Sequence, residues 1–108
     1  QGAPVALNAT GALTAAAILS GIVTSTTAAA VAATLPTGAV MDLASTFEIG
    51  DAFDWSVITT GANALTVTAA ASGHTVVGNM VVAAGKAGRF RTRKTAADTF
   101  VTYSLSNT

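Results

Sequence analysis

Large apolar side chains alternate with small or polar ones along residues 49–71, IGDAFDWSVITTGANALTVTAAA. In the first half of this stretch the large side chains stand at every second position, and these are Phe53, Trp55 and Val57. A period of two is typical of a half-buried strand, so the pattern predicts a strand with Trp55 in the core. The alternation resumes at residues 65–69 after a loop at residues 59–63 that contains Gly and Asn. Two such runs joined by this loop predict a hairpin of two antiparallel strands.

Two short helices are predicted in the N-terminal half of the chain. Thr14 is placed to cap a helical turn over residues 15–20, and Gly21 is placed to end it. A second group of apolar residues follows at i, i+3, i+4 and i+7, the spacing of one helical face, and consists of Val40, Leu43, Ala44 and Phe47. This spacing predicts a helix over residues 37–46 that lies across one end of a sheet.

The remaining apolar runs are short and separated by turn residues. Val, Ile and Thr are frequent in residues 22–27 and 30–35, which are predicted strands. Ser72-Gly73 opens a turn into a strand at residues 74–77, and Gly78-Asn79 predicts a tight connection to the next apolar run. Two further strands alternate around Phe90 and over residues 101–105.

About seven to eight short strands at spacings near ten residues predict an all-β fold with one or two short helices. The expected architecture is a single-domain antiparallel β-sandwich or barrel over residues 11–108. Residues 1–10 carry Pro4 and no charge, which predicts an extended N-terminal arm that docks on another surface.

Composition makes association with other chains an expectation. Only 9% of the 108 residues are charged, against about 25% in an ordinary soluble domain, and the formal net charge is zero. A surface with so few charges is poorly protected against association, so a homo-oligomer is expected. The absence of Cys excludes a disulfide scaffold and a thiolate metal site.

The few charges are segregated along the chain. Residues 1–41 contain no Asp, Glu, Lys, Arg or His, and all five basic residues fall within residues 86–94. An uncharged stretch of this length could be a membrane segment, but Ser and Thr are too frequent in residues 12–35 for a spanning helix. The uncharged third is instead expected to be buried against neighbouring subunits, with no membrane contact.

No catalytic, cofactor or metal site is expected. His74 is the only histidine and has no Cys, Asp or Glu at ligand spacing, so a surface or core role is expected for it. Asp51 and Asp54 with Glu48 lack the alternating oxygen ligands of a calcium loop and are expected to be exposed acids. Without a nucleophile and base the chain is not expected to be an enzyme.

Arg89, Arg91 and Arg93 project from one face of a predicted strand, about 6.6 to 7 Å apart, and their like charges require an anionic partner. Nucleic acid is not expected, because the chain has zero net charge and few aromatic residues. Pairing with Glu48, Asp51 and Asp54 is expected, within one subunit or across a contact. Solvated charges that block strand addition are the remaining alternative. Pro4 and Val5 in the arm complete the candidate interface.

The chain resembles the small head decoration, or cement, proteins of tailed bacteriophages from residue 11 to residue 106. The segments that carry this resemblance are Leu35-Pro36-Thr37, Gly50-Asp51-Ala52-Phe53-Asp54, Thr66-Val67-Thr68, Val77-Gly78-Asn79 and Phe90-Arg91-Thr92-Arg93-Lys94. The resemblance implies a virion structural protein, commonly a homotrimer, on the outer surface of the capsid. Its implied partners are the major capsid protein and further copies of itself. A fibre or adhesin domain that recognises a cell-surface glycan is the alternative function.

Overall fold

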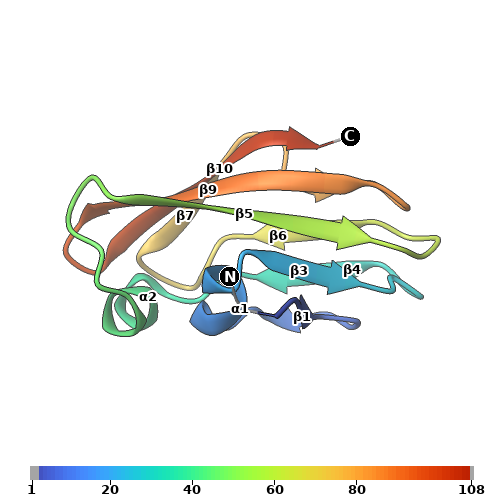
Figure 1. The fold of residues 1–108 in the computed structure, drawn as a ribbon, viewed down its shortest axis with the longest axis horizontal. Coiled ribbons are helices and arrows are strands. Elements are labelled where there is room, and N and C mark those ends of the chain that lie inside the picture. Colours follow the sequence, from blue (N-terminus) through green and yellow to red (C-terminus); the bar gives the residue numbers. More distant parts are fainter. Residues whose placement is uncertain (1–2, 108) are drawn as a thin grey trace.

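The computed structural model describes residues 3–107 and contains ten strands and two short helices in this range (Figure 1). The strands are β1 Val5–Ala6, β2 Gly11–Ala12, β3 Ile22–Ser25, β4 Val31–Thr34, β5 Ala52–Thr59, β6 Leu65–Thr68, β7 His74–Val77, β8 Val81–Val82, β9 Ala87–Ala96 and β10 Thr99–Asn107. The helices are α1 Ala15–Leu19 and α2 Gly38–Ala44.

The strands form two mixed sheets. The large sheet has the order β1-β3-β5-β9-β10-β7, and the small sheet has the order β2-β4-β6-β8. In the large sheet β1, β3 and β5 are parallel, β9 is antiparallel to β5 and β10, and β7 is parallel to β10. In the small sheet β2, β4 and β6 are parallel and β8 is antiparallel to β6. The prediction of a strand-rich fold is confirmed, whereas the predicted antiparallel pairing is wrong for the first six strands.

The parallel pairing arises because each of the first six strands is followed by a strand of the other sheet. We call such a strand–loop–strand unit, which connects the two sheets, an arch. The β3–β4 and β5–β6 arches have connections of equal length, residues 26–30 and 60–64, and they stack in register. Val23 pairs with Val57 and Ala33 pairs with Val67, so both strands of the arch are displaced by 34 residues, from 23 to 57 and from 33 to 67. The β1–β2 arch lies at the outer end of this stack.

The hairpin predicted within residues 49–71 is therefore wrong: both strands are present, as β5 and β6, but they belong to different sheets and form an arch. The two stacked loops bond directly to one another: Thr60 N–H donates to the Ser25 carbonyl (2.9 Å) and Asn63 Nδ2 donates to the Thr27 carbonyl (3.1 Å). A Cβ on Gly61 would lie 1.7 Å from the Thr26 carbonyl oxygen, so this close approach requires glycine. These long-range contacts cannot be read from the local alternation of β5 and β6.

The connection at Gly78-Asn79 differs from its prediction in the same way. It joins β7 of the large sheet to β8 of the small sheet, so the two strands do not pair with each other. The only adjacent strands that form a hairpin within residues 3–107 are β9 and β10, which pair from Ala96–Thr99 to Gly88–Asn107.

Both predicted helices are present, and the predicted cap of the first helix is confirmed. Thr14 Oγ1 accepts a hydrogen bond from Ala17 N–H (3.1 Å) before α1, and Thr37 Oγ1 accepts one from Val40 N–H (3.3 Å) before α2. The orientation of α2 differs from its apolar spacing, because Leu43 is 90% exposed while Met41 is fully buried. Its first turn packs so closely on the β9–β10 turn that a Cβ on Gly38 would lie 1.9 Å from the Asp98 carbonyl oxygen. This contact directs Met41 into the core and leaves the predicted apolar face outside.

The core lies between the sheets and is closed by the two helices at one end (Figure 1). Trp55 is 1% exposed, as predicted, and packs against Phe90 with ring centroids 5.0 Å apart. Val23 and Val57 from the large sheet meet Leu65 and other aliphatic side chains from the small sheet. The even-numbered positions of β9 point inward, which leaves the arginines of that strand on the outer face of the large sheet.

Part of the predicted N-terminal arm forms a strand that pairs with β3 of the same chain. Residues 1 and 2 lie outside the described range, and Pro4 is exposed. Val5 and Ala6 pair with Val23 and Thr24 as β1, at the edge of the large sheet. Docking of this segment on a further surface stays a prediction.

Candidate interaction surfaces

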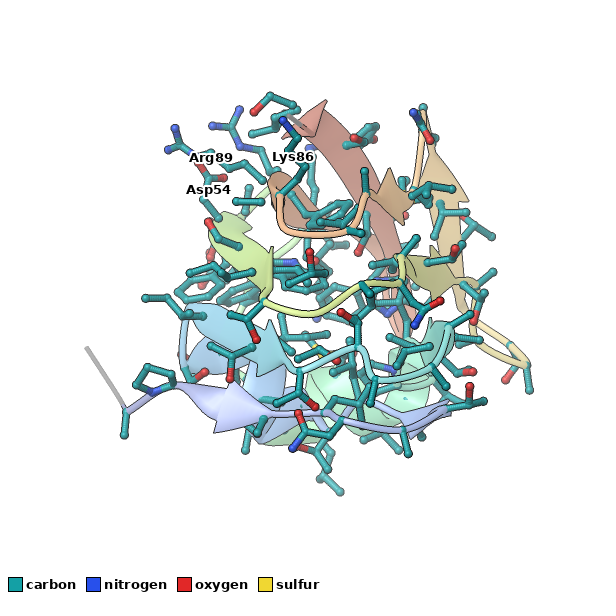
Figure 2. The ribbon with its side chains drawn as sticks, turned by 90° about the vertical axis from the view of Figure 1, so that its right-hand side faces the viewer. Asp54, Lys86 and Arg89 are labelled. Atoms are coloured by element: carbon teal, nitrogen blue, oxygen red, sulfur yellow. The ribbon has the colours of Figure 1, made fainter. Side chains whose placement is uncertain are left out.

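The arginine row lies on the outer face of β9, as the alternation predicted. Arg89, Arg91 and Arg93 are exposed, while Phe90 and Thr92 between them are fully buried. Figure 2 shows Arg89 and Asp54 on the same side of the molecule as Lys86, which precedes β9. We call the outer face formed by Lys86 and the three arginines the basic face.

Asp54 on β5 is the acid that pairs with this row within the same chain. Arg91 holds it with two hydrogen bonds, from Nε to Oδ1 (2.6 Å) and from Nη2 to Oδ2 (3.0 Å), and Arg89 Nη2 lies 3.3 Å from Oδ2. The hydrogen bond from Arg91 holds the pKa of Asp54 below its usual value, although partial desolvation opposes this effect. The same pair raises the pKa of Arg91. For Asp54 the predicted pairing is thus present within one subunit.

Glu48 and Asp51 are not brought to the arginine row. They lie in the turn before β5, where Asp51 Oδ2 accepts a hydrogen bond from Glu48 N–H (2.9 Å). In residues 3–107 neither acid forms an ion pair, and neither does Arg93. Pairing of these residues across a subunit contact stays a prediction.

A second ion pair joins α2 to β9 and was not predicted. Lys94 Nζ donates to Asp42 Oδ1 and to the Phe47 carbonyl (3.1 Å), and Asp42 Oδ2 accepts from Asp98 N–H (2.9 Å). The hydrogen bond from Lys94 lowers the pKa of Asp42. The available signal was that Lys94 interrupts the alternation of the arginines and therefore points away from their face. The pair fixes α2 on the β9–β10 turn and is structural.

A buried chain of hydrogen bonds crosses the large sheet beneath the basic face. Trp55 Nε1 donates to Thr92 Oγ1 (2.9 Å), Thr92 Oγ1 lies 2.8 Å from Thr102 Oγ1, and Thr102 Oγ1 lies 2.7 Å from His74 Nε2. His74 Nδ1 lies 2.9 Å from the Pro36 carbonyl oxygen, which can only accept. The proton of a neutral His74 is therefore on Nδ1, and each hydroxyl in turn donates toward Nε2. In that single arrangement every side-chain polar atom in the series of hydrogen bonds from Trp55 to His74 has a partner.

His74 is thus a core residue, 1% exposed, which is one of the two roles expected from its sequence context. Desolvation lowers its pKa, partly offset by the hydrogen bond to Pro36. Among the described residues no group of three or more His, Cys, Asp or Glu side chains could hold a metal ion. The alternation Phe100, Thr102 in β10 marked these positions as one face, but the sequence did not indicate that a hydroxyl would be buried there.

A second surface is uncharged and surrounds a groove that contains no residue of the basic face. A groove of about 390 Å³ runs between the ends of the parallel strands of the small sheet and the two helices. Its lining is predominantly apolar and consists of Ala12, Leu13, Thr14, Ala15, Thr34, Leu35, Pro36, Thr37, Val40 and Ala71. Leu43 is exposed on α2 beside it, and the edge strands β1 and β2, with Pro4 and Val5, continue the uncharged surface.

No helix in the described part of the chain is long and apolar enough to cross a membrane. Comparison of the chain with protein-family models, with curated proteins and with solved structures finds no match.

Proposed function

We propose that this protein is a capsid decoration protein, which binds the outer surface of a bacteriophage head and stabilises contacts between coat subunits. Its partner is the major capsid protein, and its place is the virion. The observation that supports this most directly is the uncharged surface. There the open end of the stacked arches, formed by the edge strands β1 and β2, adjoins the apolar groove. The resemblance of the sequence to cement proteins of tailed phages agrees with this assignment.

The open end of the arches suits attachment to another chain. β1 and β2 are edge strands of the two sheets, and no charged residue lies within residues 1–41 to prevent strand addition. The neighbouring groove offers an apolar site for a coat-protein side chain, with exposed Val40 at its rim. Burial of this surface against coat subunits requires no desolvation of charge, which favours a tight contact.

A glycan-binding domain is less well supported by the aromatic residues. Sugar sites commonly use exposed aromatic rings, whereas Trp55 is buried and Tyr103 is only partly exposed in the middle of β10. The polar atom of Trp55 is already bonded to Thr92. We therefore retain capsid decoration as the proposed function.

The test uses coat shells that lack the decoration protein and a matched pair of variants. Val40→Glu places a charge at the groove, and at the third position of α2 it also completes a Thr-x-x-Glu capping box with Thr37 that stabilises the helix. Val81→Glu is the control, because Val81 is 42% exposed against 49% for Val40 and lies in β8, at the opposite edge of the small sheet from β2 and outside the groove. Co-sedimentation with the shells is expected for wild type and Val81→Glu and is expected to be lost for Val40→Glu. Absence of wild-type binding to shells, combined with binding on a glycan array, would reject the proposal in favour of the adhesin alternative.

A further inference from the structure

The basic face carries more positive charge than its own chain neutralises. Lys86, Arg89, Arg91 and Arg93 are four bases, and Asp54 is the one acid bound among them, which leaves a net charge of +3. Within residues 3–107 neither Lys86 nor Arg93 forms an ion pair. Figure 2 shows Lys86 and Arg89 projecting from the outside of the fold, where a partner can reach them. This surface is therefore suited to an acidic partner.

Apolar side chains border the arginines on the same face. Tyr103 of β10 stands opposite Arg91, and Val101 stands opposite Arg93. Val77 of β7, opposite Tyr103, is 52% exposed. Cross-strand partners share one face of a sheet, so a row of positive charge runs beside a row of apolar contacts. A matching partner would present an apolar side chain flanked by carboxylates.

The turn at residues 48–51 has this combination of side chains. Ile49 is 66% exposed and stands between Glu48 and Asp51, neither of which has a cationic partner in the described chain. The turn is closed by two hydrogen bonds between Glu48 and Asp51, each 2.9 Å long. Gly50 N–H donates to the Lys94 carbonyl (2.8 Å), which fixes the turn to the end of β9. We call residues 48–51 the acidic turn.

The acidic turn adjoins one end of the basic face of its own chain and does not cover the rest of it. Ala52, directly after the turn, pairs with Arg93, but neither Glu48 nor Asp51 forms an ion pair with that arginine. The backbone of the turn is bonded to Lys94 at this end of β9, whereas Lys86 lies beyond the other end of the strand. About eight residues of strand separate these points, a distance of about 25 Å at 3.3 Å per residue. The two complementary surfaces therefore remain available to other molecules at the same time.

We propose that the acidic turn of one copy of this chain docks on the basic face of another copy. Ile49 packs beside Tyr103 and Val101 of the second copy, while Glu48 and Asp51 pair with its arginines. A polyanion such as nucleic acid is less favoured as the partner, because dedicated binders carry an excess of positive charge and this chain has none overall. The contact joins two different surfaces, so successive copies form a closed ring or an open chain.

The test is self-association of the purified protein, measured by sedimentation velocity without coat protein. Glu48→Lys and Arg93→Glu each reverse one side of the contact at a side chain without an ion pair in its own chain, so neither is expected to change the thermal midpoint. Each variant alone is expected to raise the self-association Kd by about tenfold. The chain that carries both substitutions is expected to recover most of this loss, because the pair then meets with its charges exchanged. Ile49→Ser is expected to weaken association at any salt concentration, whereas added salt weakens the charged contribution.

Three outcomes would overturn the proposal. The first is a wild-type protein that stays monomeric at hundreds of micromolar. The second is a double variant that associates no better than either single variant. The third is binding of wild type to a single-stranded DNA oligonucleotide or heparin that is lost in Arg93→Glu while self-association is unchanged, which would assign the basic face to a polyanion. None of these outcomes alters binding to coat shells through the uncharged surface, so the two proposals fail independently.

Discussion

The stacked arches and the long β9–β10 hairpin stabilise the same two sheets in different ways. The arches bury mainly Val, Leu and Ala, and their loops are joined by Thr, Asn and backbone groups. The hairpin buries aromatic rings and a chain of hydroxyls ending at His74, and it carries ion pairs outside. The arches should therefore respond to changes in backbone space and hardly to pH, whereas the hairpin should respond to pH and to the loss of single polar atoms.

The largest effect is expected where the two regions meet, at Trp55. Trp55→Ala removes a fully buried ring that packs on Phe90 and leaves Thr92 without its indole donor. A loss of about 3 to 5 kcal/mol in the free energy of unfolding is expected, measured by urea denaturation. Native Trp fluorescence should also be blue-shifted and poorly quenched by acrylamide. Tyr103→Ala, which changes a partly exposed ring on β10, serves as the control and should cost much less.

His74 tests the hairpin side of the comparison. His74→Phe keeps an aromatic ring but leaves the Thr102 hydroxyl and the Pro36 carbonyl without their partner. A buried polar group without a partner costs about 1 to 3 kcal/mol, so a loss of this order for each group is expected in urea denaturation. An unchanged free energy of unfolding would show that water replaces the imidazole.

The same residue gives the pH dependence. Its pKa is lowered in the folded protein from an ordinary value of 6.5, so below that pH the unfolded chain binds more protons. Protonation also places a donor on Nε2, which reverses the direction of the hydrogen bond with Thr102. One of the two hydroxyls, of Thr92 or Thr102, is then left without an acceptor. The contribution of neutral His74 to the free energy of unfolding is therefore expected to be fully present above about pH 6.5 and to decrease as the pH is lowered below that value. Asp42 and Asp54 have lowered pKa values, so they lose their contributions only below about pH 4. The slope between pH 6 and 4.5 should disappear in His74→Phe, as measured by thermal unfolding at a series of pH values.

Gly61 tests the arches. Gly61→Ala places a methyl group against the Thr26 carbonyl oxygen. This backbone atom cannot move without displacing the loop of the neighbouring arch, residues 26–30. A loss of about 1 to 3 kcal/mol in the free energy of unfolding is expected, with the same value at pH 7.5 and pH 5. Gly11→Ala in β2 is the matched control, because nothing lies closer than 4.0 Å to its added methyl group. Equal stabilities of the two variants would contradict the close stacking of the arch loops.

The two regions also differ in how far the sequence predicted them. In the hairpin the alternation of Phe90 with the arginines located β9, its faces and the following turn, because both strands are adjacent in the chain and pair with each other. In the arches the same alternation located β5 and β6 but predicted the wrong pairing. An alternation of period two shows which side chains of a strand point inward. It does not show to which sheet the strand belongs, because inward-pointing side chains of both sheets enter the same core. The displacement of 34 residues between the arches was present in the sequence as two strand–loop–strand segments of equal length, but their Ala- and Thr-rich side chains share little identity.

For the candidate surfaces, sequence predicted the direction of the arginines and missed the division of the acids. Glu48, Asp51 and Asp54 lie within seven residues, but only Asp54 lies on a strand paired with β9. The exposed face of α2 was also missed, since burial of Met41 in place of Leu43 depends on the contact between Gly38 and the distant Asp98. Both errors concern contacts between residues more than thirty positions apart, which local patterns do not encode.

The smallest effect is expected for the ion pair between Asp54 and Arg91, although its geometry is the best of those on the surface. Asp54→Asn keeps the shape of the side chain and removes its charge, and Arg91→Gln removes the guanidinium. The arginine side chain is 48% exposed and Asp54 is 29% exposed, so water and salt screen most of the attraction. Each variant should therefore lower the thermal midpoint only slightly, and the double variant should show a small coupling that decreases as salt is raised.

Removal of Asp54 should also free Arg89 and Arg91 for an external carboxylate, so Asp54→Asn is expected to strengthen self-association while it weakens the fold. A variant that weakened both in parallel would mean that Asp54 positions the arginines for their partner, and the basic face would then depend on its own acid.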